Sequence, residues 1–383
     1  MYRRKIDSFL LEWKNNPTHK PLVIKGCRQC GKTSSVVAFA RKHYKHVIYI
    51  DFHEQEHLCS LFDGSLSVDY LTMAISASVP NAQFVPKKTC LILDEIQNCP
   101  RARSSLKFFM QDGRYDVICT GSLLSVSGYK SAEQIKVESQ ATIPVGAETI
   151  VDMYPMDFEE WLWANGIASN IFDYLKKSLL DETPIAASIH ERLRQLLLEY
   201  IVVGGMPEAV KTFFATHDMN QVAQVQRHIL NGYRDDMIKY ARAEDKPRIR
   251  ECFDSIPRQL SRDNKKFTYS LVRKGGRSKE YISCLQWIED AGIIRRCYNL
   301  LMPELPLSGN AIQECFKVYL ADTGLLVSML DDGSQGDILQ GNLWTYKGAV
   351  YENLVADILG KMGRKLYYKQ KEKITKIPVK FSL

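Results

Sequence analysis

The sequence predicts an α/β protein built on a parallel sheet, followed by a helical region and a smaller region of helices and strands. Three observations lead to this fold class. Short apolar runs alternate with helical patterns over about the first 160 residues, as in βαβ units. A glycine-rich loop joins the first run to a helix. From residue 157 to residue 240 the pattern is helical, with breaks.

Length and composition limit the classes of protein. The chain has 383 residues, of which 45% are hydrophobic and 25% charged, values typical of a soluble globular protein of two or three domains. No apolar run approaches the ~20 residues of a membrane span, and the basic N-terminus lacks the pattern of a signal peptide. We therefore expect a cytoplasmic protein with no membrane partner. Ten scattered cysteines fit a reducing compartment.

The first motif is the loop at residues 26–33, GCRQCGKT, which fits the Walker A pattern G-x-x-x-x-G-K-[ST]. An apolar strand pattern at 21–25 precedes it and a helical pattern at 33–43 follows, so the motif has the context of a phosphate-binding P-loop. Lys32 would reach the β- and γ-phosphates of ATP, and the Thr33 hydroxyl would bind Mg²⁺. The residues expected to bind the nucleotide here are Gly26, Arg28, Gln29, Cys30, Gly31, Lys32, Thr33 and Ser34. Cys27 and Cys30 form a C-x-x-C pair, but both fill variable positions of the loop.

A second motif is the hydrophobic strand pattern at 90–95, which ends in Asp94 and Glu95 and fits the Walker B pattern. We expect this strand to lie parallel to the P-loop strand and beside it, with the two acids at the carboxyl edge where such sheets bind ligands. Asp94 would hold Mg²⁺. Glu95 would act as the catalytic general base that polarises the attacking water.

The next strand pattern, at 115–122, follows a helix predicted at 104–111. Its polar end is expected beside the Walker B strand, so the hydroxyl of Thr120 or Ser122 is a candidate sensor of the γ-phosphate. The alternative is an ordinary turn at the end of a strand. Residues 125–142 read as a polar loop, and residues 143–153 as the last strand of the sheet.

Within the helical stretch, residues 203–208 read VGGMPE and should end one helix and begin the next, since glycine suits a helix C-terminus and proline a first turn. A sharper interpretation makes this turn part of a lid that touches the nucleotide.

Residues 239–298 carry the basic character of the chain. They contain fifteen Lys or Arg and eight Asp or Glu, an excess of seven that equals the net charge of the whole protein. Helical patterns at 249–261, 268–272 and 278–291 precede strands at 293–298 and 316–320, which is the outline of a winged helix. Its approach to the third helix is basic, with Arg273, Lys274, Arg277 and Lys279. DNA is one partner that residues 246–298 would suit, and a protein is another.

Six short motifs follow one another along the chain: the Walker A loop, LDEIQ at 93–97, TGS at 120–122, YPMDFEE at 154–160, GGMP at 204–207 and LADTGLL at 320–326. Together they resemble the bacterial and archaeal AAA-superfamily P-loop ATPases that carry a C-terminal domain of unknown function. The resemblance implies an ATPase core at 1–160, a helical lid at 161–245, a winged helix at 246–330 and a nuclease-like region at 331–383. It also implies that Pro207 packs near the adenine.

The sequence departs from that family in two places. An arginine expected before the last sheet strand is absent from residues 144–148, and Arg234 is a weak substitute for an arginine finger. In the nuclease-like region Glu352 takes the position of the acid that such nucleases carry on a helix. After the strand at 366–368, however, the only acidic residue is Glu372, and there is no aspartate. The region therefore reads as truncated, and we expect no DNA cleavage.

Three functions follow in decreasing order of support. The first is a protein that binds ATP and Mg²⁺ and hydrolyses ATP as a conformational switch. The second is a nucleic-acid-binding regulator in which the bound nucleotide serves as a slow switch. The third is a metal-dependent nuclease. The sequence indicates neither the oligomeric state nor the physiological task.

Overall fold

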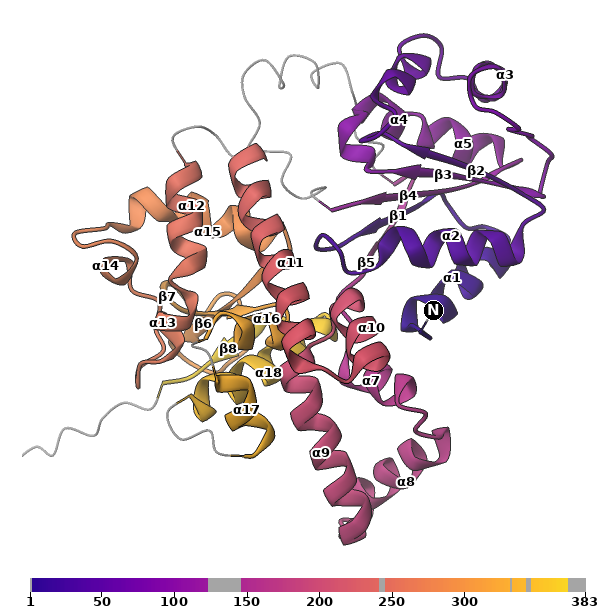
Figure 1. Ribbon diagram of the computed structural model, residues 1–383. Coiled ribbons are helices and arrows are strands. Elements are labelled where there is room, and N and C mark those ends of the chain that lie inside the picture. The colour runs from indigo at the N-terminus through magenta and orange to yellow at the C-terminus, as the bar shows by residue number, and fades with distance from the viewer. Residues whose placement is uncertain (1, 123–145, 241–244, 331–332, 342–345, 371–383) are drawn as a thin grey trace, which may run out of the picture.

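The computed structural model describes residues 2–122, 146–240, 245–330, 333–341 and 346–370. Its N-terminal part is a five-stranded parallel sheet with the order β2-β3-β4-β1-β5. Figure 1 shows this sheet in indigo and purple, apart from the orange and yellow C-terminal elements. The strands are β1 (Leu22–Lys25), β2 (His46–Asp51), β3 (Thr89–Asp94), β4 (Asp116–Gly121) and β5 (Thr149–Asp152).

The strand order corrects one expectation. β3, which carries Asp94, does not lie beside the P-loop strand β1, because β4 pairs with both and separates them. The expected pairing of β4 with β3 is confirmed. Of the strand expected at 143–153, β5 forms only Thr149–Asp152, and residues 143–145 lie outside the described residues, as does the polar loop at 125–142.

Two hydrophobic clusters cover the two faces of the sheet. Side chains alternate along β3, so Leu91 and Leu93 enter one cluster while Cys90 and Ile92 enter the other. The helix predicted at 104–111 is present as α5, which begins at Leu106, and a separate short helix, α4, ends at Ser104. The helices of this part are α1 (Lys5–Asn15), α2 (Lys32–His43), η1 (Glu56–Phe62), α3 (Val68–Ser78), η2 (Ile96–Asn98), α4 (Pro100–Ser104) and α5 (Leu106–Asp112).

A helical region follows the sheet. The GGMP turn joins two of its helices as predicted, with Gly204 after the first and Pro207 opening the second. Figure 1 shows α11 between the sheet and the C-terminal elements. The helices are α7 (Phe158–Ala164), α8 (Ser169–Leu180), α9 (Ala187–Val203), α10 (Pro207–Thr216) and α11 (Met219–Tyr240).

In the basic segment helices precede two strands, as predicted, but the helix expected at 249–261 is divided at Ser255 and the helix expected at 268–272 is a single short turn. β6 and β7 pair antiparallel. That this arrangement works as a winged helix stays a prediction. Its elements are α12 (Lys246–Asp254), α13 (Ile256–Leu260), α14 (Tyr269–Val272), α15 (Ser278–Asp290), β6 (Ile294–Leu300) and β7 (Ala311–Leu320).

The last described elements pack on the same region. They are α16 (Thr323–Ser328), α17 (Ser334–Leu339), α18 (Lys347–Lys361) and β8 (Leu366–Tyr368), of which β8 pairs parallel with β6. One continuous hydrophobic cluster extends from Met156 to Leu366 and includes side chains from the helical region, the basic segment and α18. Among the described residues, no helix is both long enough and apolar enough to cross a membrane.

Candidate nucleotide-binding site

The predicted P-loop connects β1 to α2 at the carboxyl edge of the sheet. A side chain at Gly26 could not fit, because its Cβ would lie 2.0 Å from the Met153 carbonyl oxygen. Gly31 adopts a left-handed conformation, with φ of 97°, immediately before the first turn of α2. These two glycines allow the loop to curve tightly against β5, as a phosphate-binding loop requires.

Lys32 is 6% exposed and points back over the loop. Its ammonium group donates hydrogen bonds to the carbonyl oxygens of Gly26, at 3.0 Å, and Cys27, at 2.9 Å. The amine therefore lies directly above the curve of the loop. The β- and γ-phosphates of a nucleotide would meet it there.

Asp94 is the centre of a polar cluster formed by four elements. It is 3% exposed, and its Oδ2 atom accepts hydrogen bonds from the Thr33 hydroxyl at 2.7 Å and the Tyr49 hydroxyl at 2.8 Å. Its Oδ1 atom accepts from the Thr120 hydroxyl. Burial and the neighbouring Asp94 charge raise the pKa of Tyr49, which therefore stays a neutral donor.

The Asp94 cluster suits a hard divalent cation. A hydroxyl and a carboxylate are oxygen ligands of the kind that Mg²⁺ selects, and the Thr33 oxygen and Asp94 Oδ2 are already in contact. Such an ion also keeps several waters and binds substrate phosphates, so two protein ligands suffice. The described residues contain no group of three or more His, Cys, Asp and Glu side chains that could hold a metal by themselves.

Glu95 lies beside this cluster, at the turn after β3. Its backbone is left-handed, with φ of 48°, which directs the chain into η2. The Glu95 Oε2 atom accepts hydrogen bonds from the Ser122 hydroxyl, at 3.3 Å, and from the Gln97 amide. The two sensor candidates thus have different partners, because Thr120 contacts Asp94 and Ser122 contacts Glu95.

The sequence analysis did not identify the residues outside the P-loop that contact it and fix its position. Arg4 is 6% exposed, and its guanidinium donates to the carbonyl oxygens of Cys30 and Tyr154 and pairs with Glu160 at 3.1 Å. Nothing local in the sequence marks Arg4, since its partners lie up to 156 positions away in the chain. The YPMDFEE run, which contains Tyr154 and Glu160, was the available signal.

Helix α11 also contacts the loop. The Tyr233 hydroxyl donates to the Arg28 carbonyl oxygen at 3.1 Å, and the Arg28 guanidinium pairs with Asp236. Asp236 is buried, and this burial raises its pKa in spite of the opposing Arg28 charge. The sequence assigned Arg28 to the nucleotide, whereas here its side chain contacts the helical region.

Pro207 also approaches the loop. Its ring lies 3.3 Å from the position that a Cβ on Gly31 would take. The preceding Gly205 is fixed on two sides, since its N–H donates to Asp322 Oδ2 at 2.7 Å and its carbonyl accepts from Met156 N–H at 2.7 Å. The GGMP turn therefore links the P-loop to the LADTGLL run. A contact between Pro207 and adenine stays a prediction.

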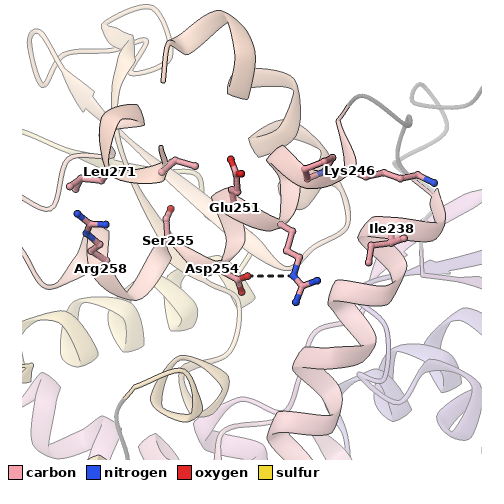
Figure 2. Close-up of a pocket in the computed structure, with 10 residues that line it drawn as sticks. Ile238, Lys246, Glu251, Asp254, Ser255, Arg258 and Leu271 are labelled. Atoms are coloured by element: carbon pink, nitrogen blue, oxygen red, sulfur yellow. Dashed lines mark ion pairs between the residues drawn. The ribbon is translucent and has the colours of Figure 1, made fainter. Parts of the chain in front are cut away.

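A pocket of about 630 Å³ lies where α11 meets α12, α13 and α14. Figure 2 shows Ile238 of α11 on one side and Leu271 on the other, with charged side chains between them. Asp254 pairs there with Arg250 at 3.7 Å and also accepts from Arg234. Arg234, the weak candidate for an arginine finger, therefore has a partner within the C-terminal half.

Glu352 has surroundings unlike those of a metal-binding nuclease acid. Its carboxylate accepts from Lys265 at 2.6 Å, Lys317 at 3.1 Å and the Tyr319 hydroxyl at 2.9 Å. Two cations thus neutralise the acid. Glu372, the other acid considered for this region, lies outside the described residues.

Comparison with known proteins agrees with the geometry of the sheet and loop. Residues 18–162 match a family model described as "AAA domain", and residues 194–336 match a "Domain of unknown function (DUF8612)". A search of curated proteins found no match.

Similar solved structures include the Walker-type ATPase PABY2304 of Pyrococcus abyssi, at 14% identity and a TM-score of 0.48, covering 86% of this chain and 96% of that one. The Aeropyrum pernix Orc1 protein in complex with DNA has 11% identity and a TM-score of 0.31, covering 89% of this chain and 93% of that one. AMPPCP-bound DnaA from Aquifex aeolicus has 10% identity and a TM-score of 0.31, covering 76% and 90%. The part of the chain that matches the AAA-domain model, residues 18–162, thus contains the P-loop and the five-stranded parallel sheet.

Proposed function

We propose that this protein binds ATP with Mg²⁺ and hydrolyses it to ADP and phosphate, and that the reaction serves as a conformational switch. The observation that carries the proposal is the convergence of Lys32, Thr33, Asp94 and Glu95, from the P-loop and the end of β3, at one edge of the sheet. The match of residues 18–162 to the AAA-domain model supports it.

Each residue has a distinct task in this proposal. The N–H groups of residues 26–34 bind the phosphates, and Lys32 moves from the loop carbonyls to the β- and γ-phosphates. Thr33 and Asp94 hold Mg²⁺, which when bound neutralises charge that develops on the phosphate oxygens. Glu95, oriented by Ser122 and Gln97, accepts the proton of the water that attacks the γ-phosphate.

The switch follows from the contacts between the loop and the helical region. Arg28 is bound to Asp236 of α11, and Gly31 lies beside Pro207 of α10. A γ-phosphate that recruits Arg28 would release α11. The helix would then transmit the change to the pocket at Ile238 and to α12.

The test compares two variants and one control variant with the wild type. Lys32→Ala should abolish ATP binding, while Lys42→Ala, which removes an exposed lysine from the same helix, should not change it. Glu95→Gln should bind ATP and lose at least about 100-fold in turnover, the usual range for a general base. Wild-type hydrolysis by Glu95→Gln would show that another group is the base.

A second candidate function is nucleic-acid binding by the basic segment. It is favoured by Arg273, Lys274, Arg277 and Lys279, which lie around the start of α15 and give this surface its positive charge. Affinity for duplex DNA should fall steeply with salt, and should fall when Arg273, Lys274 and Arg277 are changed together to alanine. Changing Lys176, Lys177 and Arg192 is the charge-matched control. DNA binding that is absent, or that does not depend on salt, would favour a protein partner.

A further inference from the structure

A second pocket, of about 360 Å³, lies on the three-stranded sheet of the C-terminal half, whose strand order is β7-β6-β8. Its walls come from β6, the start of β7 with the loop before it, the start of β8 with the turn before it, and the last turn of α15. We call it the β6–β8 pocket. None of its lining residues belongs to the P-loop or to the pocket of Figure 2. Its volume falls within the range of about 300–1,000 Å³ that is typical of small-molecule sites.

Two tyrosines of the lining are neighbours on adjacent strands. Tyr298 of β6 and Tyr367 of β8 are partners in the parallel register, so their side chains leave the same face of the sheet. Both side chains are half-buried, and both line the β6–β8 pocket. Two aromatic rings side by side and partly open are a surface on which a planar base can stack.

The Tyr298 ring is held in place by its neighbours. The Arg296 guanidinium lies 5.6 Å from the centre of this ring, and the centre of the Phe316 ring on β7 lies 5.8 Å from it. Arg296 is itself fixed, because its side chain is only 8% exposed and its Nε donates to Glu289 at 2.6 Å. A ligand that stacks on Tyr298 would therefore meet a ring that is already ordered, which lowers the entropic cost of binding.

The lining of the pocket is strongly basic. It carries four cationic side chains and one carboxylate: Arg295, Arg296, Arg364, Lys365 and Glu289. The carboxylate already pairs with Arg296. Arg364 and Lys365 are exposed, and neither side chain has an ion-pair partner in the part of the chain that the structure describes. These two cations are free to bind an anion at the mouth of the pocket.

The two kinds of side chain alternate along the strands. Arg296 and Tyr298 are two residues apart in β6 and so share a face, and Lys365 precedes Tyr367 by two residues at the start of β8. Proteins that bind unpaired nucleic acid combine the same two features, since cations bind the phosphates and aromatic rings stack on the bases.

We propose that the β6–β8 pocket binds a nucleotide unit, with its base on Tyr298 and Tyr367 and its phosphate at Arg364 and Lys365. The unit is either a free nucleotide or part of an unpaired strand, which share this chemistry. A base within a duplex is already stacked and paired, so duplex DNA is not the ligand.

This proposal rests neither on ATP hydrolysis nor on duplex binding by the basic segment. Arg277 lies just before the first turn of α15, whereas Glu289, which lines the β6–β8 pocket, lies in its last turn. At 1.5 Å per residue the backbones of these two residues are about 18 Å apart along the helix. The surface around the start of α15 and the β6–β8 pocket can therefore be tested separately.

The experiment uses the full-length protein and two probes, thymidine monophosphate and a fluorescein-labelled oligothymidylate, which forms no duplex. Calorimetry measures the affinity for the first, and fluorescence anisotropy measures the affinity for the second over a series of salt concentrations. Binding of both probes, or of the free nucleotide alone, would assign the pocket to nucleotides, and binding of the strand alone would assign it to unpaired nucleic acid. Lys32→Ala is measured in parallel, because a probe bound at the P-loop would lose affinity in that variant.

Two changes in the pocket make the test specific. Tyr367→Ala should weaken binding by about tenfold or more, as expected when a base loses its aromatic partner, whereas Tyr367→Phe should stay within about twofold of wild type. Changing Arg364 and Lys365 together to alanine should weaken binding of whichever probe binds. For the strand it should also reduce the slope of log affinity against log salt by about 1.4, or about 0.7 for each lost phosphate contact. Changing Lys176 and Lys177 to alanine, two exposed lysines of α8, is the charge-matched control.

Several outcomes would overturn the inference. They are binding of neither probe by the folded wild-type protein, an affinity that falls only in Lys32→Ala, and an affinity that falls only when Arg273, Lys274 and Arg277 are changed. Equal losses in Tyr367→Ala and Tyr367→Phe would likewise show that the ring is not a stacking surface. Circular dichroism checks that each variant folds. If Tyr367→Ala does not, the change at the exposed Arg364 and Lys365 still decides the question.

Discussion

The Thr33 hydroxyl donates a 2.7 Å hydrogen bond to the Asp94 carboxylate, although the two residues are 61 positions apart in the chain. Thr33 belongs to the first turn of α2 and Asp94 ends β3, so the contact crosses β4, which separates β3 from the loop strand. The two oxygens expected to bind Mg²⁺ thus lie side by side.

This contact leads to a prediction for Thr33→Val, which keeps the shape of the side chain and removes the hydroxyl. ATP affinity measured in EDTA should stay within about twofold of wild type, while the gain in affinity from added Mg²⁺ should fall about tenfold, or 1.4 kcal/mol. Thr72→Val is the control, because that hydroxyl bonds to the Asp69 carbonyl within α3, away from the P-loop. Full Mg²⁺ stimulation of Thr33→Val would contradict the assignment.

Asp236 should restrain the nucleotide site. Asp236→Ala removes a buried carboxylate and frees the Arg28 guanidinium, which is 43% exposed and can then reach a phosphate. We expect ATP affinity to rise by at least about threefold. On the scale of binding free energy, a tenfold rise would be about 1.4 kcal/mol. The exposed neighbour in Asp235→Ala should have no such effect. Calorimetric titration of both variants would measure the difference, and a weaker affinity for Asp236→Ala would show that α11 supports the loop instead.

Alanine substitutions at two glycines, one in the tight GGMP turn and one inside α11, should have opposite effects on the free energy of unfolding. In Gly205→Ala the new Cβ would lie 1.9 Å from the Met156 carbonyl oxygen, so the turn must open and we expect a loss of about 3 kcal/mol in the free energy of unfolding. A Cβ added at Gly232, inside α11, would meet no described neighbour within 4 Å beyond the backbone of its own helix, so Gly232→Ala should gain about 0.8 kcal/mol from helix propensity. Urea unfolding measures both changes. Equal stability of the two variants would contradict the packing argument.

Glu352 gives a prediction that depends on pH. Burial raises the pKa of this carboxylate, but hydrogen bonds from Lys265, Lys317 and Tyr319 outweigh burial, and the net shift is downward from 4.5. A depressed folded-state pKa stabilises the protein above the unfolded value, and the contribution disappears as the pH falls through the folded value.

Glu352→Gln should therefore lower the free energy of unfolding at pH 7 by less than about 1 kcal/mol, since solvent screens this half-exposed group. The difference from wild type should shrink as the pH falls below 4.5. Glu314→Gln, at an exposed position of β7, should match wild type at both pH values. A difference that grows towards acidic pH would show that the carboxylate is not held by the two lysines.

Local signals predicted the elements that carry the site. Periodicity placed a helix at 278–291, and α15 ends one residue earlier at Asp290. Spacing placed the two acids at the end of a buried strand. Residue patterns could not place β4 between β1 and β3, because all three strands are similarly apolar. The sequence of one such strand does not specify which strands pair with it.

The contacts that hold the loop from outside were also not predictable. Arg28 and Asp236 are 208 positions apart, and both read as ordinary charges on their own elements. Glu352 suggested a metal ligand by its place in a helix, but Lys265 and Lys317 reach it from 87 and 35 positions away. Such partners depend on how elements pack, which a single sequence does not specify.

The continuous cluster from Met156 to Leu366 has a consequence for dissecting this protein. Val350 and Leu354 of α18 are buried in the same cluster as Trp161 and Trp287. Deleting residues 331–383 would expose that apolar surface, so we expect the remaining C-terminal half to lose cooperative unfolding rather than to behave as a shortened protein. The polypeptide after the sheet should therefore melt as one block, whatever separate tasks its segments perform.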